Sequence, residues 1–128
     1  MYKFHSGLEE IVAKQLDDSK IRYKFEKLRI YYNKEDNQKS FYTPDFVLEN
    51  GIIVEAKGQF VTKDRKKHKL IREQYGKKYD IRFVFSNPNQ KIGTKSNTSY
   101  ADWCGLFGFK CAKEKIPQEW LEERKTNV

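Results

Sequence analysis

Three residues in the middle of the chain have the types and the spacing needed to act on a phosphate: Asp45, Glu55 and Lys57. Glu55 and Lys57 are two residues apart, so in a strand their side chains leave the same face of the sheet. Two neighbouring carboxylates repel each other, and a hard divalent cation bound by oxygen ligands, Mg²⁺ or Mn²⁺, relieves that repulsion. A lysine beside such a cation can hold a water molecule or a phosphate oxygen. Together the three residues indicate metal-assisted hydrolysis of a phosphodiester.

The residues around this trio predict a β-hairpin. Short apolar runs at residues 46–48 and 52–54 stand on either side of Asn50-Gly51, a strong hairpin signal. The spacing Asp-x₉-Glu-x-Lys is by itself short and degenerate. A surface hairpin in which Glu55 and Lys57 form an ordinary ion pair is therefore the alternative interpretation.

The length of the hairpin loop decides whether the acids meet. A two-residue loop would place Asp45 opposite Ala56 and turn it away from Glu55. A three-residue loop over residues 49–51, with Gly51 in the left-handed region as a bulge, would pair Asp45 with Glu55. We predict the bulged turn, because that register brings the acids together.

The composition is that of one globular domain with a polyanionic partner. The chain has 128 residues, of which 38% are hydrophobic and 15% aromatic, enough for a modest core. The net charge of +8 and the pI near 9.4 favour nucleic acid over a membrane as the partner. No apolar run reaches membrane length and no signal-peptide pattern is present, so we expect a soluble intracellular protein that is not secreted. Cys104 and Cys111 lack zinc-site spacing and are expected to be reduced core residues.

Outside the hairpin, the patterns predict an α/β fold with a central mixed β-sheet flanked by helices. Ser6 and Glu9 form a capping box that opens a helix, and capping alone accounts for Glu9 at this point. Apolar residues alternate over residues 20–32 with a change of parity, which indicates a bend or bulge. The remaining segments are a polar linker at residues 33–40, strands at residues 80–86 and 109–112, and helices that begin at Ser99 and Pro117.

A strongly basic helix follows the hairpin. Residues 63–69 hold five cations and one histidine, in a helix that we expect to begin near Thr62 or Asp64 and to end near Tyr75. Such a run is often only a solvated face, but its place directly after a candidate metal site favours phosphate contact, above all for Lys66 and Lys67. His68 is either a phosphate donor or an incidental residue of the helix surface. The predicted DNA-binding residues are Lys63, Arg65, Lys66, Lys67, His68, Lys69 and Arg72.

With these residues placed, the sequence resembles the bacteriophage endonuclease I family of Holliday-junction resolvases, in the PD-(D/E)xK nuclease superfamily. The superfamily signature alone is weak, but segments that match the family run in order along most of the chain. They are residues 6–9, 42–46, 50–52, 54–55, 57–58, 64–68, 70–74, 81–82, 84–86, 98–100, 116–117 and 119–120.

The resemblance implies a restriction-endonuclease-like core and a Mg²⁺-dependent endonuclease, with Mn²⁺ as a substitute and no small-molecule cofactor. Its substrate would be branched DNA, including four-way junctions, cut by paired incisions that leave 5′-phosphates. By position, Asp45, Glu55 and the main-chain carbonyl of Ala56 would bind the metal. Lys57 would position the attacking water or steady the charge of the transition state. Glu9 would be a fourth active-site carboxylate and metal ligand in addition to its capping role.

The resemblance also implies an intertwined homodimer built from one nuclease domain, residues 1–128. Residues 1–32 of one chain would complete the site of the other, residues 33–41 would form the bridge, and residues 42–128 the catalytic core. A phage-encoded enzyme of this kind would act in the host cytoplasm. Two alternatives stay open: a related sequence-specific or mismatch endonuclease on the same core, and a non-catalytic basic nucleic-acid-binding module.

Overall fold

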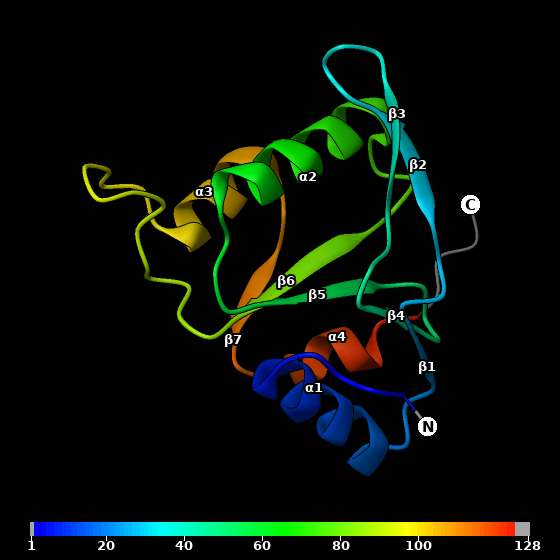
Figure 1. Cartoon of the computed structure of the whole chain (residues 1–128). Helices are drawn as coiled ribbons and strands as arrows, with labels where there is room; N and C mark the ends of the chain where they lie inside the picture. Colours follow the sequence, from blue (N-terminus) through cyan, green and yellow to red (C-terminus); the bar gives the residue numbers. More distant parts are fainter. Residues whose placement is uncertain (1, 125–128) are drawn as a thin grey trace.

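The computed structural model describes residues 2–124 and has a five-stranded mixed sheet at its centre (Figure 1). The pairs β1–β4 and β4–β5 are antiparallel, whereas β5–β6 and β6–β7 are parallel. The predicted central mixed sheet is confirmed. In spatial order the strands are β1 (Tyr23–Phe25), β4 (Phe46–Leu48), β5 (Ile53–Lys57), β6 (Ile81–Phe85) and β7 (Cys111–Lys113).

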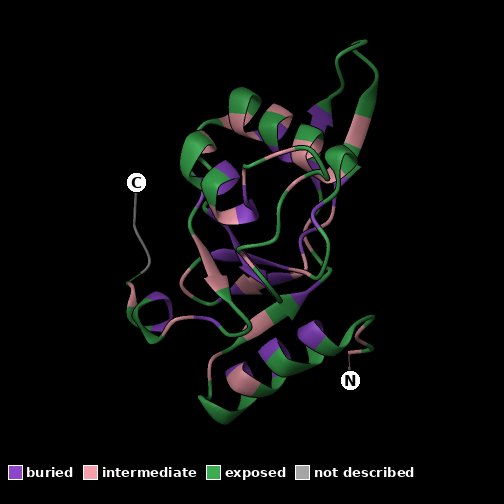
Figure 2. Ribbon diagram, turned by 90° about the vertical axis from the view of Figure 1, so that its left-hand side faces the viewer, coloured by how far each residue is buried: buried purple, intermediate pink, exposed green. Residues whose placement is uncertain are grey.

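Helices cover both faces of this sheet (Figure 1). Buried residues line the sheet and the inward helix faces, while the outward helix faces are exposed (Figure 2). The period-two alternation of the strands divides the core, because Val54 faces one apolar cluster and Ile53 the other. Among the described residues no helix is long and apolar enough to cross a membrane. The helices are α1 (Gly7–Asp18) and α4 (Gln118–Glu122) on the Val54 side, and α2 (Thr62–Tyr75) and α3 (Tyr100–Phe107) on the Ile53 side.

Strands β2 (Ile30–Asn33) and β3 (Lys39–Tyr42) form a separate antiparallel hairpin beside α2 (Figure 1). Gln74 of α2 holds the end of β2, since it accepts a 2.8 Å hydrogen bond from Asn33 N and donates one of 2.6 Å to Asn33 O. The apolar alternation over residues 20–32 changes parity after Phe25, where the chain leaves the main sheet and goes on to β2. The predicted bend is therefore real, but it joins strands of two sheets instead of two halves of one strand.

The turn between β4 and β5 has the predicted bulged form. Gly51 has a φ of 91°, and its N–H donates to Leu48 O at 2.8 Å. Phe46 pairs with Val54 across the hairpin. This register places Asp45, one residue before Phe46, opposite Glu55.

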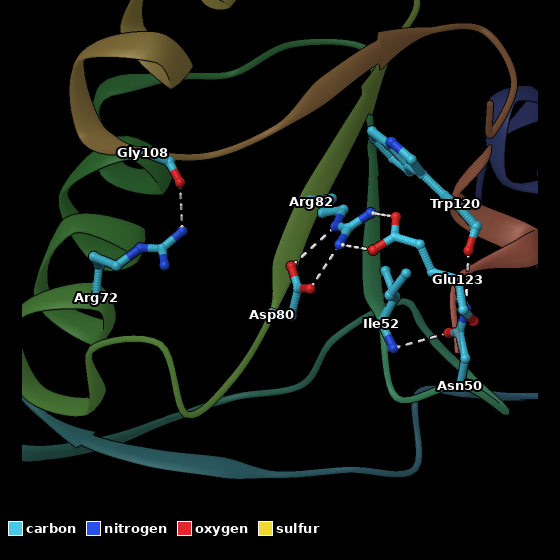
Figure 3. Close-up of polar contacts among 8 residues, drawn as sticks. All are labelled: Asn50, Ile52, Arg72, Asp80, Arg82, Gly108, Trp120 and Glu123. Carbon is cyan, nitrogen blue, oxygen red and sulfur yellow. Dashed lines mark hydrogen bonds and ion pairs between the residues drawn. The ribbon is translucent and has the colours of Figure 1, made fainter. Parts of the chain in front are cut away.

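The same turn is tied to the C-terminal helix (Figure 3). The Asn50 side-chain amide donates to Trp120 O at 2.8 Å and to Glu123 O at 3.0 Å. Arg82, buried in β6, forms ion pairs with Asp80 and Glu123, and these raise the pKa of Arg82 and lower the pKa of Glu123. The buried guanidinium is thus neutralised, and the loop that sets the β4–β5 register is anchored from a distant part of the chain.

The predicted starts of α1 and α3 agree with the structure. Helix α2 begins at Thr62, but its N-cap residue is Val61, which makes no side-chain hydrogen bond, so neither Thr62 nor Asp64 is the cap. Ser6 caps α1 by accepting a hydrogen bond from Glu9 N, and Ser99 and Asp102 form a capping box at α3. Gly108 ends α3 in the left-handed conformation. Trp103 and Trp120 are buried. Cys104 and Cys111 are free thiols, as expected, but only Cys104 is buried, and Cys111 is half-buried.

Replacing Gly51 by alanine tests the turn. No atom lies within 4 Å of an added Cβ there, so the penalty comes from the positive φ alone, about 1 kcal/mol of unfolding free energy. Gly105, in the exposed part of α3 and equally uncrowded, is the matched control, and its alanine variant should gain roughly 0.5–1 kcal/mol. Urea unfolding of both variants measures the difference, and equal stabilities would contradict the bulged turn.

Candidate active site

Two carboxylates, Asp45 and Glu55, meet where β4 begins and β5 ends. Glu55 Oε2 accepts a 2.7 Å hydrogen bond from Asp45 N, and Asp45 Oδ2 accepts a 2.9 Å hydrogen bond from Ala56 N. Each acid is therefore oriented by a main-chain N–H of the opposing strand. The two side chains lie together only because the bulged turn pairs their residues.

Burial raises the free energy of the ionised forms of Asp45 and Glu55. Glu55 is 2% exposed, and burial raises its pKa against the opposing effect of Lys57. Burial, followed by the charge of Glu55 and later of Glu9, raises the pKa of Asp45 to about 9, while the hydrogen bond from Ala56 acts in the other direction. Two acids that resist ionisation together form a donor set suited to a divalent cation.

Glu9 and Glu26 approach Asp45 from its other side. Glu9, on α1, is 7% exposed, and its Oε1 accepts a 2.7 Å hydrogen bond from His5 N, one residue before the helix cap. One carboxylate oxygen each from Glu9, Glu26 and Asp45 lie within 4.8 Å of one another. The structure brings Glu9 to Asp45 of the same chain, whereas the resemblance implied that Glu9 would serve the Asp45 of a partner chain. The oxygen atoms of this group fit a hard cation.

Glu26 is a residue that the sequence prediction missed. It follows the last residue of β1, its N–H donates to Asp45 O at 3.0 Å, and its φ is 53°. A positive φ is strained for a residue with a side chain, and such strain is concentrated at functional sites. The change of parity in residues 20–32 located this bend, but it did not indicate which side chain would face Asp45.

Lys57 lies at the end of β5 beside the acids. Its Nζ is 3.6 Å from Asp64 Oδ1 in the first turn of α2, and its charge acts on Glu55. The carbonyl oxygen of Lys57 accepts a hydrogen bond from Ser86 N, on the β6 side of the strand. Because main-chain groups of successive residues point to opposite sides of a strand, the N–H and C=O of Ala56 point toward β4 and Asp45. Glu9, Asp45, Glu55, Ala56 and Lys57 are therefore gathered at one place.

His68 contradicts the prediction that it lies on the surface of the basic helix. It is fully buried, packs edge-on against Tyr42 and Phe83, and its Nε2 lies 3.9 Å from Glu55 Oε1. Burial, with the nearby charge of Lys67, lowers its pKa well below the usual value, so the ring is neutral. The helical periodicity of α2 turns this position toward the core, and His68 cannot reach a DNA phosphate.

The other predicted DNA-binding residues of α2 divide into two groups. Arg65 donates to Phe60 O, and Arg72 donates to Gly108 O and lies 4.1 Å from the Phe109 ring centroid. The guanidinium groups of Arg65 and Arg72 are thus engaged in contacts within the protein. Lys63, Lys66 and Lys69 are exposed, whereas Lys67 is partly buried beside the acids.

The comparisons with known proteins agree with one another. The family model described as phage endonuclease I matches residues 1–128. The chain is 46% identical over 125 residues to endonuclease I of Escherichia phage T7, covering 98% of this chain and 83% of that protein. It is 45% identical over 125 residues to endodeoxyribonuclease 1 of Enterobacteria phage T3, covering 98% of this chain and 81% of that protein.

The raised pKa of Asp45 predicts how stability depends on pH without divalent cations. The folded state keeps a proton that the unfolded chain releases, so this carboxyl makes the protein less stable as pH rises from about 4 toward about 9. Asp45→Asn removes this effect. Because each unit of pKa difference is worth about 1.4 kcal/mol, we expect the variant to exceed wild type by at least that amount near pH 8, and by less near pH 5.

Urea unfolding in a chelator at both pH values measures this gain. Asp18→Asn, at an exposed position of α1, is the control for the exchange of Asp for Asn itself. A gain for Asp45→Asn that does not grow with pH would show that Asp45 is ionised in the folded protein.

Proposed function

This chain belongs to the phage endonuclease I family and is a DNA endonuclease, and we propose that it hydrolyses phosphodiesters of branched DNA, four-way junctions included, with a divalent cation. The observation that carries the proposal is the position of Asp45. The charges of Glu55 and Glu9 act on its carboxylate, one oxygen of which lies within 4.8 Å of oxygens of Glu9 and Glu26. Lys57 lies two residues after Glu55 at the end of β5.

Asp45, Glu55 and the Ala56 carbonyl would hold Mg²⁺, or Mn²⁺ in its place, and Glu9 would complete the oxygen ligands. The bound cation supplies charge neutralisation and a more acidic water. The protein holds the acids in place: Ala56 N and Asp45 N fix their orientations, and burial excludes competing water.

Lys57 is a positively charged side chain that the chain contributes to the site. It lies on the same face of β5 as Glu55 and is partly exposed, with 22% of its side chain accessible. Its ammonium group would position the attacking water or stabilise the charge that develops on the phosphate. Asp64, 3.6 Å away, holds this side chain near the strand end before DNA binds.

We propose further that the active form is an intertwined homodimer that makes paired incisions and leaves 5′-phosphates. Glu9 and Glu26 both precede residues 33–41, so an exchange of residues 1–32 would deliver both acids to the partner's Asp45. The β2–β3 hairpin supports this proposal because it stands apart from the main sheet, and opening its turn would separate residues 1–32 from the rest of the chain.

The proposed chemistry requires that Asp45 be essential for cleavage and dispensable for binding. In Mg²⁺, we expect Asp45→Ala to cut a synthetic four-way junction at least about 10³-fold more slowly than wild type, while gel-shift affinity is kept. Glu9→Gln should also be impaired, whereas Glu10→Gln, its exposed neighbour on α1, should cut normally.

Three outcomes separate this proposal from its alternatives. Junction cleavage by Asp45→Ala at the wild-type rate rejects the site. Equal cleavage of a junction and of a linear duplex with the same arms favours a sequence-specific or mismatch endonuclease. Binding without any cation-dependent cleavage favours a non-catalytic module.

The exposed lysines of α2 predict the salt dependence of DNA binding. Lys63 and Lys66 are exposed near the start of α2 and line a cavity together with residues of the β2–β3 turn. If each contacts one phosphate, the double variant Lys63→Gln/Lys66→Gln lowers the slope of log affinity against log salt by about two. Binding titrations at several salt concentrations measure the slope, and an unchanged slope would place the DNA on another surface.

A further inference from the structure

Two consecutive lysines of α2, Lys66 and Lys67, have different surroundings. The Lys66 side chain is 64% exposed, and its Nζ lies 3.9 Å from Glu35 Oε2 in the β2–β3 turn. Lys67 is partly buried, and its Nζ lies 5.0 Å from the centroid of the Tyr42 ring. Tyr42 ends β3, three residues before Asp45. Lys66 therefore belongs to the outer surface, whereas Lys67 faces the strand ends that carry the acids.

The positive charge of Lys67 is only partly balanced by the nearby acids. Burial and the charge of Lys57 lower its pKa, while Glu55, Asp64 and Asp45 act in the opposite direction. Within residues 2–124, no carboxylate oxygen lies within 4.0 Å of its Nζ. A partly desolvated ammonium group without a direct partner disfavours the folded state. An anion bound beside it would offset that cost.

We propose that Lys67 is a second active-site lysine, whose ammonium group contacts a non-bridging oxygen of the phosphate that is cut. Lys57 comes from β5 and Lys67 from α2, so the two cations reach the space beside the acids from different elements. Lys57 already has a carboxylate, Asp64, within 3.6 Å. Lys67 has no carboxylate partner of this kind among the described residues, so its ammonium group is available to bind an anionic substrate.

The chemical class of the ligand follows from the proposed function, on which this inference rests. A compact ammonium group held at the edge of a buried acid cluster favours a tetrahedral anion with several oxygens. Its charge would count most where negative charge increases during the reaction, so its effect would fall on the rate more than on binding. A lysine that only balances the buried acids would instead affect stability and leave the phosphate chemistry unchanged.

Single-turnover cleavage of a four-way junction in Mg²⁺ distinguishes these roles. Lys67→Met keeps an aliphatic stem over Tyr42 and removes the charge, and we expect the rate at saturating enzyme to fall by about 10²-fold with little change in junction affinity. Lys67→Arg should recover part of the loss. Sulfur in place of one non-bridging oxygen of the cut phosphate should slow the wild type more than Lys67→Met, because the variant already lacks that contact.

Two further lysines provide the comparisons. Lys66→Met should weaken junction binding instead, and Lys14→Met, on α1 with its Nζ 3.0 Å from Asp18, should leave rate and affinity unchanged. A wild-type rate for Lys67→Met, or a full sulfur effect in it, would overturn the inference while leaving the proposed function intact. If wild type cuts neither junction nor duplex, the proposed function fails and this inference with it. If Lys67→Met does not fold, Lys67→Gln replaces it in the same assays.

Discussion

The contact between Asp45 and Glu55 is the constraint around which this protein is built. Two carboxylates that are largely removed from water repel each other and lose hydration, so their pKa values rise. The chain compensates through its backbone, because Asp45 N and Ala56 N each donate to the acid of the opposing strand. These hydrogen bonds form in only one strand register, so a shift in the pairing of β4 with β5 would also separate the two acids.

Distant parts of the chain maintain that register. Asn50 joins the β4–β5 turn to the main chain of the last helix, and Glu123 of the same region neutralises Arg82 in the neighbouring strand. A residue far from the acids can thus influence the site by keeping the turn in place. Trp120 and Glu123 are therefore structurally linked to the hairpin, although they are distant from it in sequence.

Several features around the acids oppose stability. Glu26 has a positive φ, His68 is buried with both ring nitrogens lacking hydrogen-bond partners among the described residues, and Lys67 is partly desolvated. Departures of this kind from local preference are expected where function competes with folding. Together with the raised pKa of Asp45, these features agree with the proposed binding of a cation and an anion, both of which would stabilise the region.

The hairpin could be predicted from the sequence, because a turn signal and a two-residue period are local properties of the chain. The bulged turn, and with it the pairing of Asp45 with Glu55, was predicted from the chemistry of the two acids, since the local turn signal also allowed a two-residue loop. The mixed sheet and the starts of α1 and α3 could also be predicted, since capping residues act within a few positions of themselves. The start of α2 after Val61 has no such capping side chain. Three features became evident only in the folded protein: Glu26 lies near Asp45, His68 is buried near Glu55, and Lys66 and Lys67 have different surroundings. Those outcomes depend on how a helix is rotated against the sheet and where a bend points a side chain, and both are set by packing between segments far apart in sequence.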